Sequence, residues 1–137
     1  MQSTVEKIKE LFSSFSKAGI TAIDKLPQAG SERHYYRIHT AGETFIAAYG
    51  ANLKENETFI YFSGHFKKKK LAVPEIFCIN AEKNIYIQED FGVVSLINRL
   101  EESGFTDEIY NLYKKSLQTL VELQVKGHDG LDYSQCL

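Results

Sequence analysis

The feature that most constrains the fold is the order in which strand-like and helix-like segments follow one another. Three runs with the composition of strands come first, separated by turn-forming residues, then a run with helical periodicity, then two more strand-like runs. The strand-like runs cover residues 20–26, 33–39, 44–49, 75–79 and 84–88, and the helical run covers residues 54–69. Because strands joined by short turns pair in antiparallel fashion, the chain is predicted to be an α+β protein. It would begin with an antiparallel meander, with the first run at an edge.

A helix is predicted before the first strand. Ser3 and Glu6 have the spacing of a capping box, in which each side chain accepts a hydrogen bond from the other residue's backbone N–H. Ile8 and Phe12 belong to an apolar series at helical spacing, and Gly19 is a natural stop signal. We therefore expect an amphipathic helix of about four turns.

Two further helices are predicted after the last strand. Residues 89–92 interrupt the strand pattern, and a short helix over residues 95–102 is expected to stop at Gly104. A long helix is expected over residues 107–125. Its apolar positions recur at helical spacing, at Ile109, Tyr113, Leu117, Leu120 and Val121.

The last residues indicate how the chain is organised. Residues 126–137 are rich in polar and turn-forming residues, which is typical of a loop that leads toward a further element. We therefore expect the chain to be part of a longer protein. The predicted division is one unit over residues 1–92, followed by the beginning of a second unit over residues 93–137.

Composition excludes several classes of protein. The 137 residues are 43% hydrophobic and 25% charged, which is typical of a globular domain. The net charge of −2 argues against a general nucleic-acid binder, and the lysines at 67–70 are interpreted as a solvated helix end. No apolar run reaches the roughly 18 residues that span a bilayer, and the N-terminus is too polar for a secretory signal. Neither the two cysteines nor the four histidines have ligand spacing. We expect a cytoplasmic protein without a metal site that binds neither nucleic acid nor membrane.

The loop between the first two strands has the residue types that a phosphate group requires. Gly30 allows the tight turn and close backbone approach that point N–H groups at an anion, and Ser31 adds a hydroxyl. Arg33 adds a fixed charge that suits phosphate. A plain hairpin turn with a surface arginine would contain the same residues, so the loop alone leaves both interpretations open.

Three passages, in the same order as in a known family, carry a resemblance. Residues 30–37 (GSERHYYR) are similar to a phosphate loop of the Gly-Ser/Asp-x-x-Arg-x-Tyr/Phe type. Residues 56–62 (NETFIYF) with residues 71–76 (LAVPEI) are similar to a central helix and the start of a fourth strand, and residues 85–92 (IYIQEDFG) to a fifth strand that enters a hinge. Over residues 20–125 the chain resembles the aminoglycoside phosphotransferase and choline kinase family, and most closely its bacterial branch of sugar and amino-sugar kinases.

The resemblance implies a protein-kinase-like N-terminal lobe: a five-stranded antiparallel sheet with one packed helix and a preceding N-terminal helix. The first helices of a truncated C-terminal lobe would follow. It implies an ATP-dependent phosphotransferase (kinase) that transfers the γ-phosphate to a hydroxyl of a small polar molecule such as a sugar, amino sugar or aminoglycoside. The catalytic base and the Mg²⁺ ligands would lie in the missing C-terminal lobe, so this chain is expected to contain no catalytic residue and to be inactive alone.

The resemblance also implies which residues contact ATP. They are Gly30, Ser31, Glu32, Arg33, Arg37, Ala47, Glu89, Asp90 and Phe91. Residues 89–91 would form the hinge, whose backbone groups pair with the edge of the adenine.

The third strand departs from the kinase pattern. Kinases carry a lysine there that contacts the α- and β-phosphates and pairs with a glutamate of the central helix. The place of the lysine falls at Ala48 or Tyr49, neither of which is charged. The central helix has acids only in its first turn, at Glu55 and Glu57. The usual ion pair is therefore expected to be missing, and Arg33 or Arg37 is a candidate to supply the charge.

Two tripeptides resemble catalytic motifs but stand in the wrong context. Residues 90–92 have the sequence Asp-Phe-Gly of a kinase metal-binding motif. In kinases that motif follows the catalytic loop, whereas residues 90–92 follow the fifth strand. Residues 128–130 are a rearranged form of the His-Gly-Asp catalytic loop, but Ser134 stands where an asparagine is required, five residues after the aspartate. We therefore do not interpret residues 90–92 as a metal site, and we interpret residues 128–130 as a polar turn.

Two other functions remain open. The uncharged third strand favours a pseudokinase or regulatory module that binds a ligand or partner without phosphotransfer. A structure without a five-stranded sheet backed by one helix would instead favour an unrelated α+β ligand-binding domain.

Overall fold

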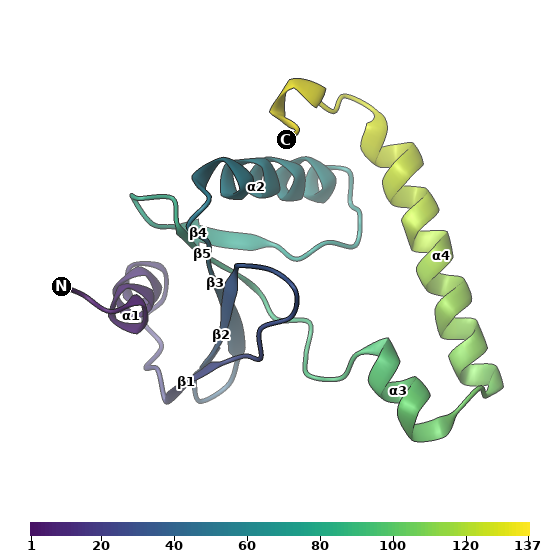
Figure 1. The fold of residues 1–137 in the computed structure, drawn as a ribbon, viewed down its shortest axis with the longest axis horizontal. Helices are drawn as coiled ribbons and strands as arrows, with labels where there is room; N and C mark the ends of the chain where they lie inside the picture. Colours follow the sequence, from purple (N-terminus) through teal and green to yellow (C-terminus); the bar gives the residue numbers. More distant parts are fainter.

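The computed structural model describes all 137 residues and contains a five-stranded sheet and four α-helices (Figure 1). The helices are α1 (Thr4–Phe15), α2 (Leu53–Lys68), α3 (Leu96–Ser103) and α4 (Asp107–His128), and a short 3-10 helix, η1 (Tyr133–Gln135), follows α4. The strands are β1 (Ala22–Lys25), β2 (His34–His39), β3 (Thr44–Tyr49), β4 (Ile76–Ile79) and β5 (Ile85–Glu89). The predicted α+β class and the predicted order of the elements are confirmed.

All neighbouring strands of the sheet are antiparallel, in the order β1-β2-β3-β5-β4. The first three strands form the predicted meander, with β1 at the edge. After β3 the chain passes through α2 to the far edge, where β4 lies, and β5 then returns between β4 and β3. The last strand before α3 therefore lies inside the sheet, between β3 and β4.

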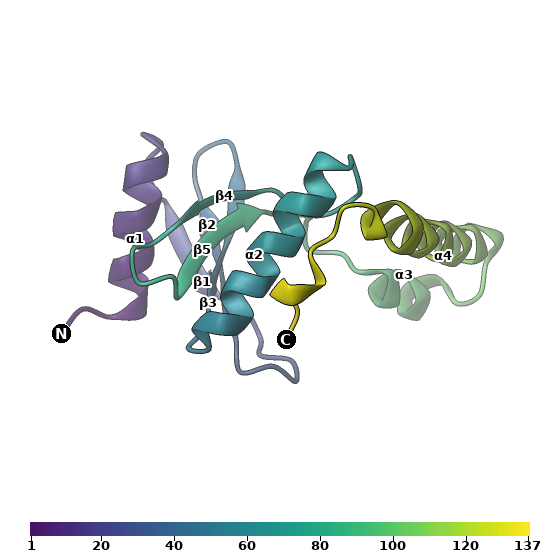
Figure 2. The same cartoon turned by 90° about the horizontal axis from the view of Figure 1, so that it is seen from above.

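One face of the sheet is covered by α1, as Figure 2 shows. The core between them consists of Ile8, Leu11, Phe12, Tyr36, Ile38, Phe45, Ala47, Ile85 and Ile87. Phe12 packs edge-on against Phe45, with the ring centroids 5.2 Å apart. Helix α1 begins at the predicted capping box of Ser3 and Glu6. Burial of this apolar helix face holds α1 on the sheet.

The opposite face of the sheet carries α2. Phe59 of α2 stacks on Tyr86 of β5, with ring centroids 5.4 Å apart. The amide of the fully buried Asn56 donates to the carbonyl of Gly50 at 2.8 Å and to that of Lys83 at 3.0 Å. A Cβ atom on Gly50 would lie 2.6 Å from Asn56 Oδ1, so this close approach requires glycine. These contacts join the start of α2 to the end of β3 and to the β4–β5 turn.

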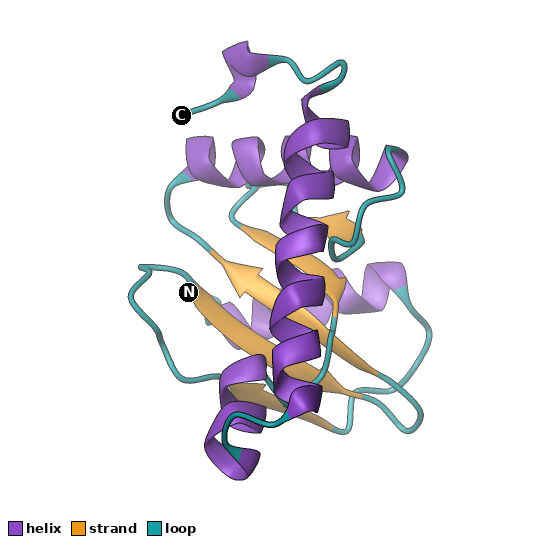
Figure 3. Ribbon diagram, turned by 90° about the vertical axis from the view of Figure 1, so that its right-hand side faces the viewer, coloured by secondary structure: helices purple, strands orange, loops and turns teal.

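Helices α3 and α4 follow the last strand, and α4 lies in front of the strands in the view of Figure 3. Both helices expose large apolar side chains, including Ile97, Leu117, Leu120, Val121 and Val125. None of the helices combines the length and the apolar character that crossing a membrane requires.

Two helix ends differ from the prediction. Helix α1 ends at Phe15 and not near Gly19, because the backbone becomes extended at Ser16, whose N–H donates to the carbonyl of Phe12 at 2.8 Å. Helix α4 continues beyond residue 125 to His128, since Gly127 packs against α2 within this last turn. Gly104, with φ of +69°, caps α3 as predicted.

The segment over residues 127–137 packs on α2; beyond the end of α4 it consists of turn and loop residues, as predicted, and the short helix η1. A Cβ atom on Gly127 would lie 2.8 Å from the ring of Phe66, so the two helices are in close contact there. The Thr58 hydroxyl donates to the carbonyl of Gln135 at 2.9 Å, and the Tyr61 hydroxyl accepts from the Asp132 N–H at 2.8 Å. Helix α2 is therefore enclosed between the sheet and the last residues of the chain. The division at residue 92 stays a prediction.

Candidate functional site

The predicted site residues lie mainly around the sheet face that carries α2. Because side chains alternate between the two faces of a strand, paired residues of neighbouring strands share a face. One row across the sheet is formed by Tyr35, Ala48 and Tyr86, and the next row by Asp24, Arg37, Ile46 and Gln88. Arg33 also lies on this side, since its side chain contacts α2.

The loop between β1 and β2 forms a tight, exposed turn. Gly30 has a φ of +64°, a left-handed conformation that favours glycine. The Ser31 N–H donates to the carbonyl of Ala29 at 2.8 Å, and the Ser31 hydroxyl accepts from the Arg33 N–H at 3.1 Å. Glu32 is exposed. The turn therefore has the predicted backbone shape, which suits both a phosphate loop and a plain hairpin connection.

Arg33 turns inward from this loop, and its side chain is only 10% exposed. Its Nη2 atom lies 3.4 Å from Glu55 Oε1, in the first turn of α2, and its guanidinium carbon lies 5.2 Å from the centre of the Phe59 ring. The Nε and Nη2 groups are buried and have no hydrogen-bond partner, because the Glu55 carboxylate is close but not aligned with them. An ion pair to the central helix is therefore present, and its cation is Arg33.

The third strand has no charged side chain on the α2 face. Ala48 lies there, fully buried between Tyr35 and Tyr86, whereas Tyr49 points to the α1 face and stacks on His34. Of the two predicted places for the lysine, only Ala48 is therefore on the relevant face.

The structure places the side chain of Ala47 away from the other predicted ATP contacts. Ala47 is fully buried in the core beneath α1, on the opposite side of the sheet from Arg33. The reason is the two-residue alternation along β3, which turns Ile46 and Ala48 toward α2 and turns Ala47 away.

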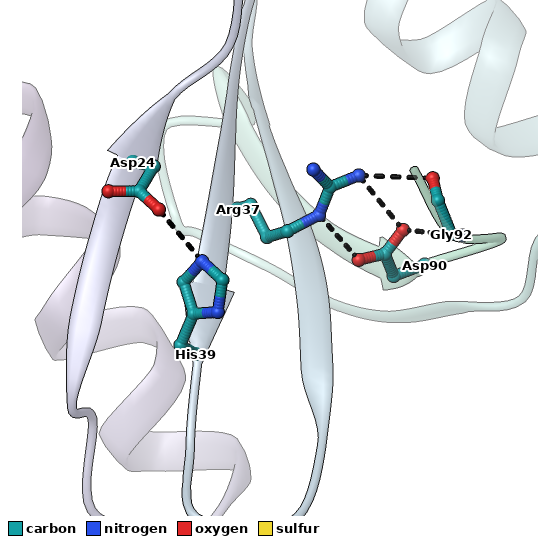
Figure 4. Close-up of polar contacts among 5 residues, drawn as sticks. All are labelled: Asp24, Arg37, His39, Asp90 and Gly92. Carbon is teal, nitrogen blue, oxygen red and sulfur yellow. Dashed lines mark hydrogen bonds and ion pairs between the residues drawn. The ribbon is translucent and has the colours of Figure 1, made fainter. Parts of the chain in front are cut away.

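Arg37 holds the segment that follows β5, as Figure 4 shows. Its Nε donates to Asp90 Oδ2 at 2.7 Å, and its Nη2 donates to Asp90 Oδ1 at 3.3 Å and to the carbonyl of Gly92 at 3.1 Å. The hydrogen bonds from Arg37 lower the pKa of Asp90 to about 2, although burial opposes this shift. The same bonds raise the pKa of Arg37. Arg37 is thus engaged within the chain, which disfavours it as a phosphate contact.

The predicted hinge residues differ in what their backbone groups do. The N–H of Glu89 donates to the carbonyl of Glu75 at 2.8 Å, so it is already used. The backbone N–H and C=O groups of Asp90 and Phe91 make no hydrogen bond within the chain, and the Phe91 side chain is exposed. Two residues of the predicted hinge therefore offer free donors and acceptors while Arg37 fixes their position.

The lysine run at residues 67–70 and the histidine His39 make contacts within the chain. The lysine run is partly neutralised, since Lys69 Nζ donates to Asp129 Oδ2 at 2.8 Å. His39 Nε2 lies 2.8 Å from Asp24 Oδ2, at the edge of the sheet that is drawn in Figure 4. No group of three or more His, Cys, Asp or Glu side chains lies close enough together to bind a metal ion.

Several residues of this face were not among the predicted contacts. Glu55, Phe59 and Tyr86 surround Arg33, and burial strongly raises the pKa of the Tyr86 phenol, whose hydroxyl also lacks a hydrogen-bond partner. The alternation of β5 could have indicated Tyr86, because residues 85 and 87 are its apolar neighbours on the other face. The contact between residues 33 and 55 has no signal in the sequence.

Comparison of the sequence with protein-family models gave no match, and comparison with curated proteins gave none either. What the site can do is therefore argued from its geometry. The charge of a guanidinium suits an anion, and backbone groups that make no hydrogen bond within the chain can pair with a planar polar edge.

Proposed function

We propose that this chain is the ATP-binding lobe of a phosphotransferase that acts on a hydroxyl of a small polar molecule, such as a sugar, amino sugar or aminoglycoside. One observation carries the proposal: the helix inserted between the third and fourth strands packs on the same sheet face that bears Arg33 and Arg37. A kinase-like lobe requires this arrangement, since its central helix and its nucleotide share one face of the sheet.

The residues of the chain fit the parts of a nucleotide. The free backbone groups of Asp90 and Phe91 suit the edge of an adenine, and the Gly30 turn and Arg33 suit the phosphates. Bound ATP would supply the phosphoryl group for transfer. The roles of this chain would be to hold the base, to orient the phosphates and to exclude water from them.

The catalytic base and the Mg²⁺ ligands are proposed to lie in a second lobe of the same protein. This chain gathers no acidic cluster suited to a metal ion. The exposed apolar side chains of α4, among them Leu117 and Val121, support a further part of the protein that packs there.

A second candidate function is a pseudokinase or regulatory module that binds a nucleotide or partner without phosphotransfer. The observation that favours it is Ala48, which is fully buried on the α2 face where a kinase has its lysine. Under this function nucleotide binding would persist without transfer.

The test uses the complete gene product. ATP binding is measured by calorimetry, and ADP release is measured with Mg²⁺ against a panel of sugars, amino sugars and aminoglycosides. Acceptor-dependent ADP release supports the phosphotransferase. ATP binding without release for any acceptor supports the regulatory module. A complete gene product that does not bind ATP contradicts the phosphotransferase and leaves, of the second function, only a module that binds a partner. Residues 1–137 alone are expected to show no turnover.

A further inference from the structure

A cavity of about 480 Å³ lies where α2, the β4–β5 turn and η1 meet. Its volume is within the range of cavities that bind small molecules. None of the predicted ATP contacts lines it, so it is separate from the candidate nucleotide site. Its walls are formed by apolar side chains of α2 and of the end and turn of β4: Ile60, Tyr61, Ile79 and Ala81. The cavity is therefore a candidate second binding site.

The β4–β5 turn, which forms one wall of the cavity, is held in one conformation by hydrogen bonds. The Asn80 side chain accepts from the N–H of Asn84 at 3.0 Å and from the N–H of Ile85 at 2.9 Å. The carbonyl of Lys83 accepts from the buried Asn56 amide at 3.0 Å. Lys83 has a φ of +60°, which is uncommon for a residue with a side chain and persists where the surroundings fix it. The turn therefore presents the Lys83 side chain from a fixed backbone.

The polar groups of the cavity favour an anionic ligand. Lys83 Nζ lies 3.2 Å from Glu57 Oε1, and the two side chains are 60% and 49% exposed. Such an exposed ion pair contributes little to stability, so the carboxylate of a ligand can replace Glu57 at small cost. The Tyr61 hydroxyl accepts from the Asp132 N–H at 2.8 Å, and its own O–H donates to no group of the chain. An ammonium and a hydroxyl are thus available as donors.

We propose that this cavity binds a small aromatic carboxylate. The ring of the ligand lies against Ile60, Ile79 and the flat face of Tyr61, and its carboxylate accepts from Lys83 and from the Tyr61 hydroxyl. The inference goes beyond the proposed function, because it uses none of the predicted ATP contacts. Since the cavity is formed by three separate segments, a bound ligand also stabilises the packing of η1 on α2.

The experiment compares 2-naphthoate with 2-naphthamide, because both have the same rings and only the first carries a negative charge. Binding to the complete gene product is measured by calorimetry. We expect a dissociation constant of about 1 mM or below for 2-naphthoate, as suits a probe of this size, and binding about 5- to 10-fold weaker for 2-naphthamide. Hydrogen exchange locates the probe: bound 2-naphthoate should slow the exchange of backbone amides in residues 79–83 and 131–136.

Two lysines with the same backbone conformation provide a matched pair of variants. Lys70 also has a φ of +60° but does not line the cavity, and glycine suits this conformation at both positions, so both variants should fold. Lys83→Gly is expected to weaken 2-naphthoate binding about 5- to 10-fold and to leave 2-naphthamide binding unchanged. Lys70→Gly should bind both probes as the parent protein does.

A variant of Glu57 tests the same contact in the opposite direction. Glu57→Gln removes the carboxylate that competes with the ligand for Lys83. It is expected to tighten 2-naphthoate binding about 2- to 5-fold, the range of an exposed ion pair, without an effect on 2-naphthamide.

The outcomes that overturn the inference are distinct from those that test the proposed function. A parent protein that binds neither probe overturns it, as does 2-naphthoate binding that leaves exchange in residues 79–83 and 131–136 unchanged. Lys83→Gly that binds 2-naphthoate as tightly as Lys70→Gly does overturns it too. ATP binding is measured on the same samples. Binding of ATP without 2-naphthoate leaves only the proposed function standing, and binding of 2-naphthoate without ATP leaves only this inference standing.

Discussion

At the scale of single residues, this sheet face contains two arginines with different surroundings. Arg37 is bonded to both oxygens of Asp90, whose side chain is only 3% exposed, whereas Arg33 has a looser partner and unused donors. Paired, buried charges that are fully bonded serve to fix a structure. The pair of Arg37 and Asp90 therefore defines where the chain leaves the sheet after β5.

The Asp90→Asn variant tests this pair by the pH dependence of stability. The pKa of Asp90 is lowered from 3.8 to about 2, so its ionised form stabilises the folded state above about pH 4, and this stabilisation is lost as the pH falls toward 2. The shift corresponds to about 2 kcal/mol. Urea unfolding of residues 1–137 at several pH values should show Asp90→Asn less stable by about that amount at pH 7, with a flatter dependence between about pH 4 and 2.

Asp24→Asn is the matched control, because Asp24 lies on the same sheet face and its side chain is 66% exposed. Its effect on the free energy of unfolding should stay below about 0.5 kcal/mol, as is usual for an exposed pair. Equal losses of unfolding free energy in both variants would show that Asp90 stabilises the fold no more than an exposed carboxylate does.

At the scale of elements, α2 is the piece that joins the parts of the molecule. Its start is tied to β3 and the β4–β5 turn through Asn56, and its end is packed against Gly127 of α4. The sequence predicted the position of α2 to within one residue at each end. It did not predict that residues 127–137 return to cover α2, because those contacts join residues that are distant in the sequence, such as Thr58 and Gln135, which are 77 positions apart.

Two helical glycines provide a matched test of the contact between α2 and α4. A Cβ atom on Gly127 would lie 2.8 Å from the Phe66 ring, whereas a Cβ atom on the exposed Gly64 of α2 would have no atom within 4 Å. Gly127→Ala is expected to lower the free energy of unfolding by about 1–3 kcal/mol through overpacking. Gly64→Ala is expected to raise it by roughly 0.5–1 kcal/mol, because alanine favours the helix.

The measurement is urea unfolding of both variants, together with limited proteolysis of the last residues. Gly127→Ala should make residues 127–137 more susceptible to cleavage, since their contact with α2 is weakened. A Gly127→Ala variant as stable as the parent chain would show that Phe66 moves aside without cost.

At the scale of the whole molecule, one side of α4 lacks the partner that its apolar residues require. Leu117, Val121 and Val125 are 64%, 55% and 69% exposed, in a helix whose spacing places them near one another. A contiguous apolar surface of this kind marks an interaction site or a tendency to associate. Under the proposed function the second lobe of the protein covers it.

Residues 1–137 alone are therefore expected to self-associate as the concentration rises, which sedimentation velocity detects. The Leu117→Lys/Val121→Lys variant should stay monomeric, because it places charges in the middle of the apolar surface. Phe105→Lys is the control: Phe105 is 89% exposed but lies outside α4, so this variant should associate as the parent chain does. A parent chain that stays monomeric at all concentrations contradicts the prediction.

The sequence by itself determined the α+β class, the order of the elements and most of their boundaries. Capping residues, periodicity and turn residues are local signals, so Ser3, Ser95 and Gly104 could mark helix ends without any knowledge of the fold. The loop at Gly30 was identified in the same way, because its left-handed conformation favours glycine.

Only the tertiary structure decided which residues of the site meet. The pairing of Arg33 with Glu55, the bonds of Arg37 to Asp90 and the burial of Ala47 beneath α1 all depend on strand register and on the face that each helix covers. A shift of register by one residue exchanges the two faces of a strand, and no local pattern fixes a contact between segments that are distant in the sequence. The sequence thus indicated both arginines as candidate site residues, and the tertiary structure pairs Arg33 with Glu55 of α2 and Arg37 with Asp90.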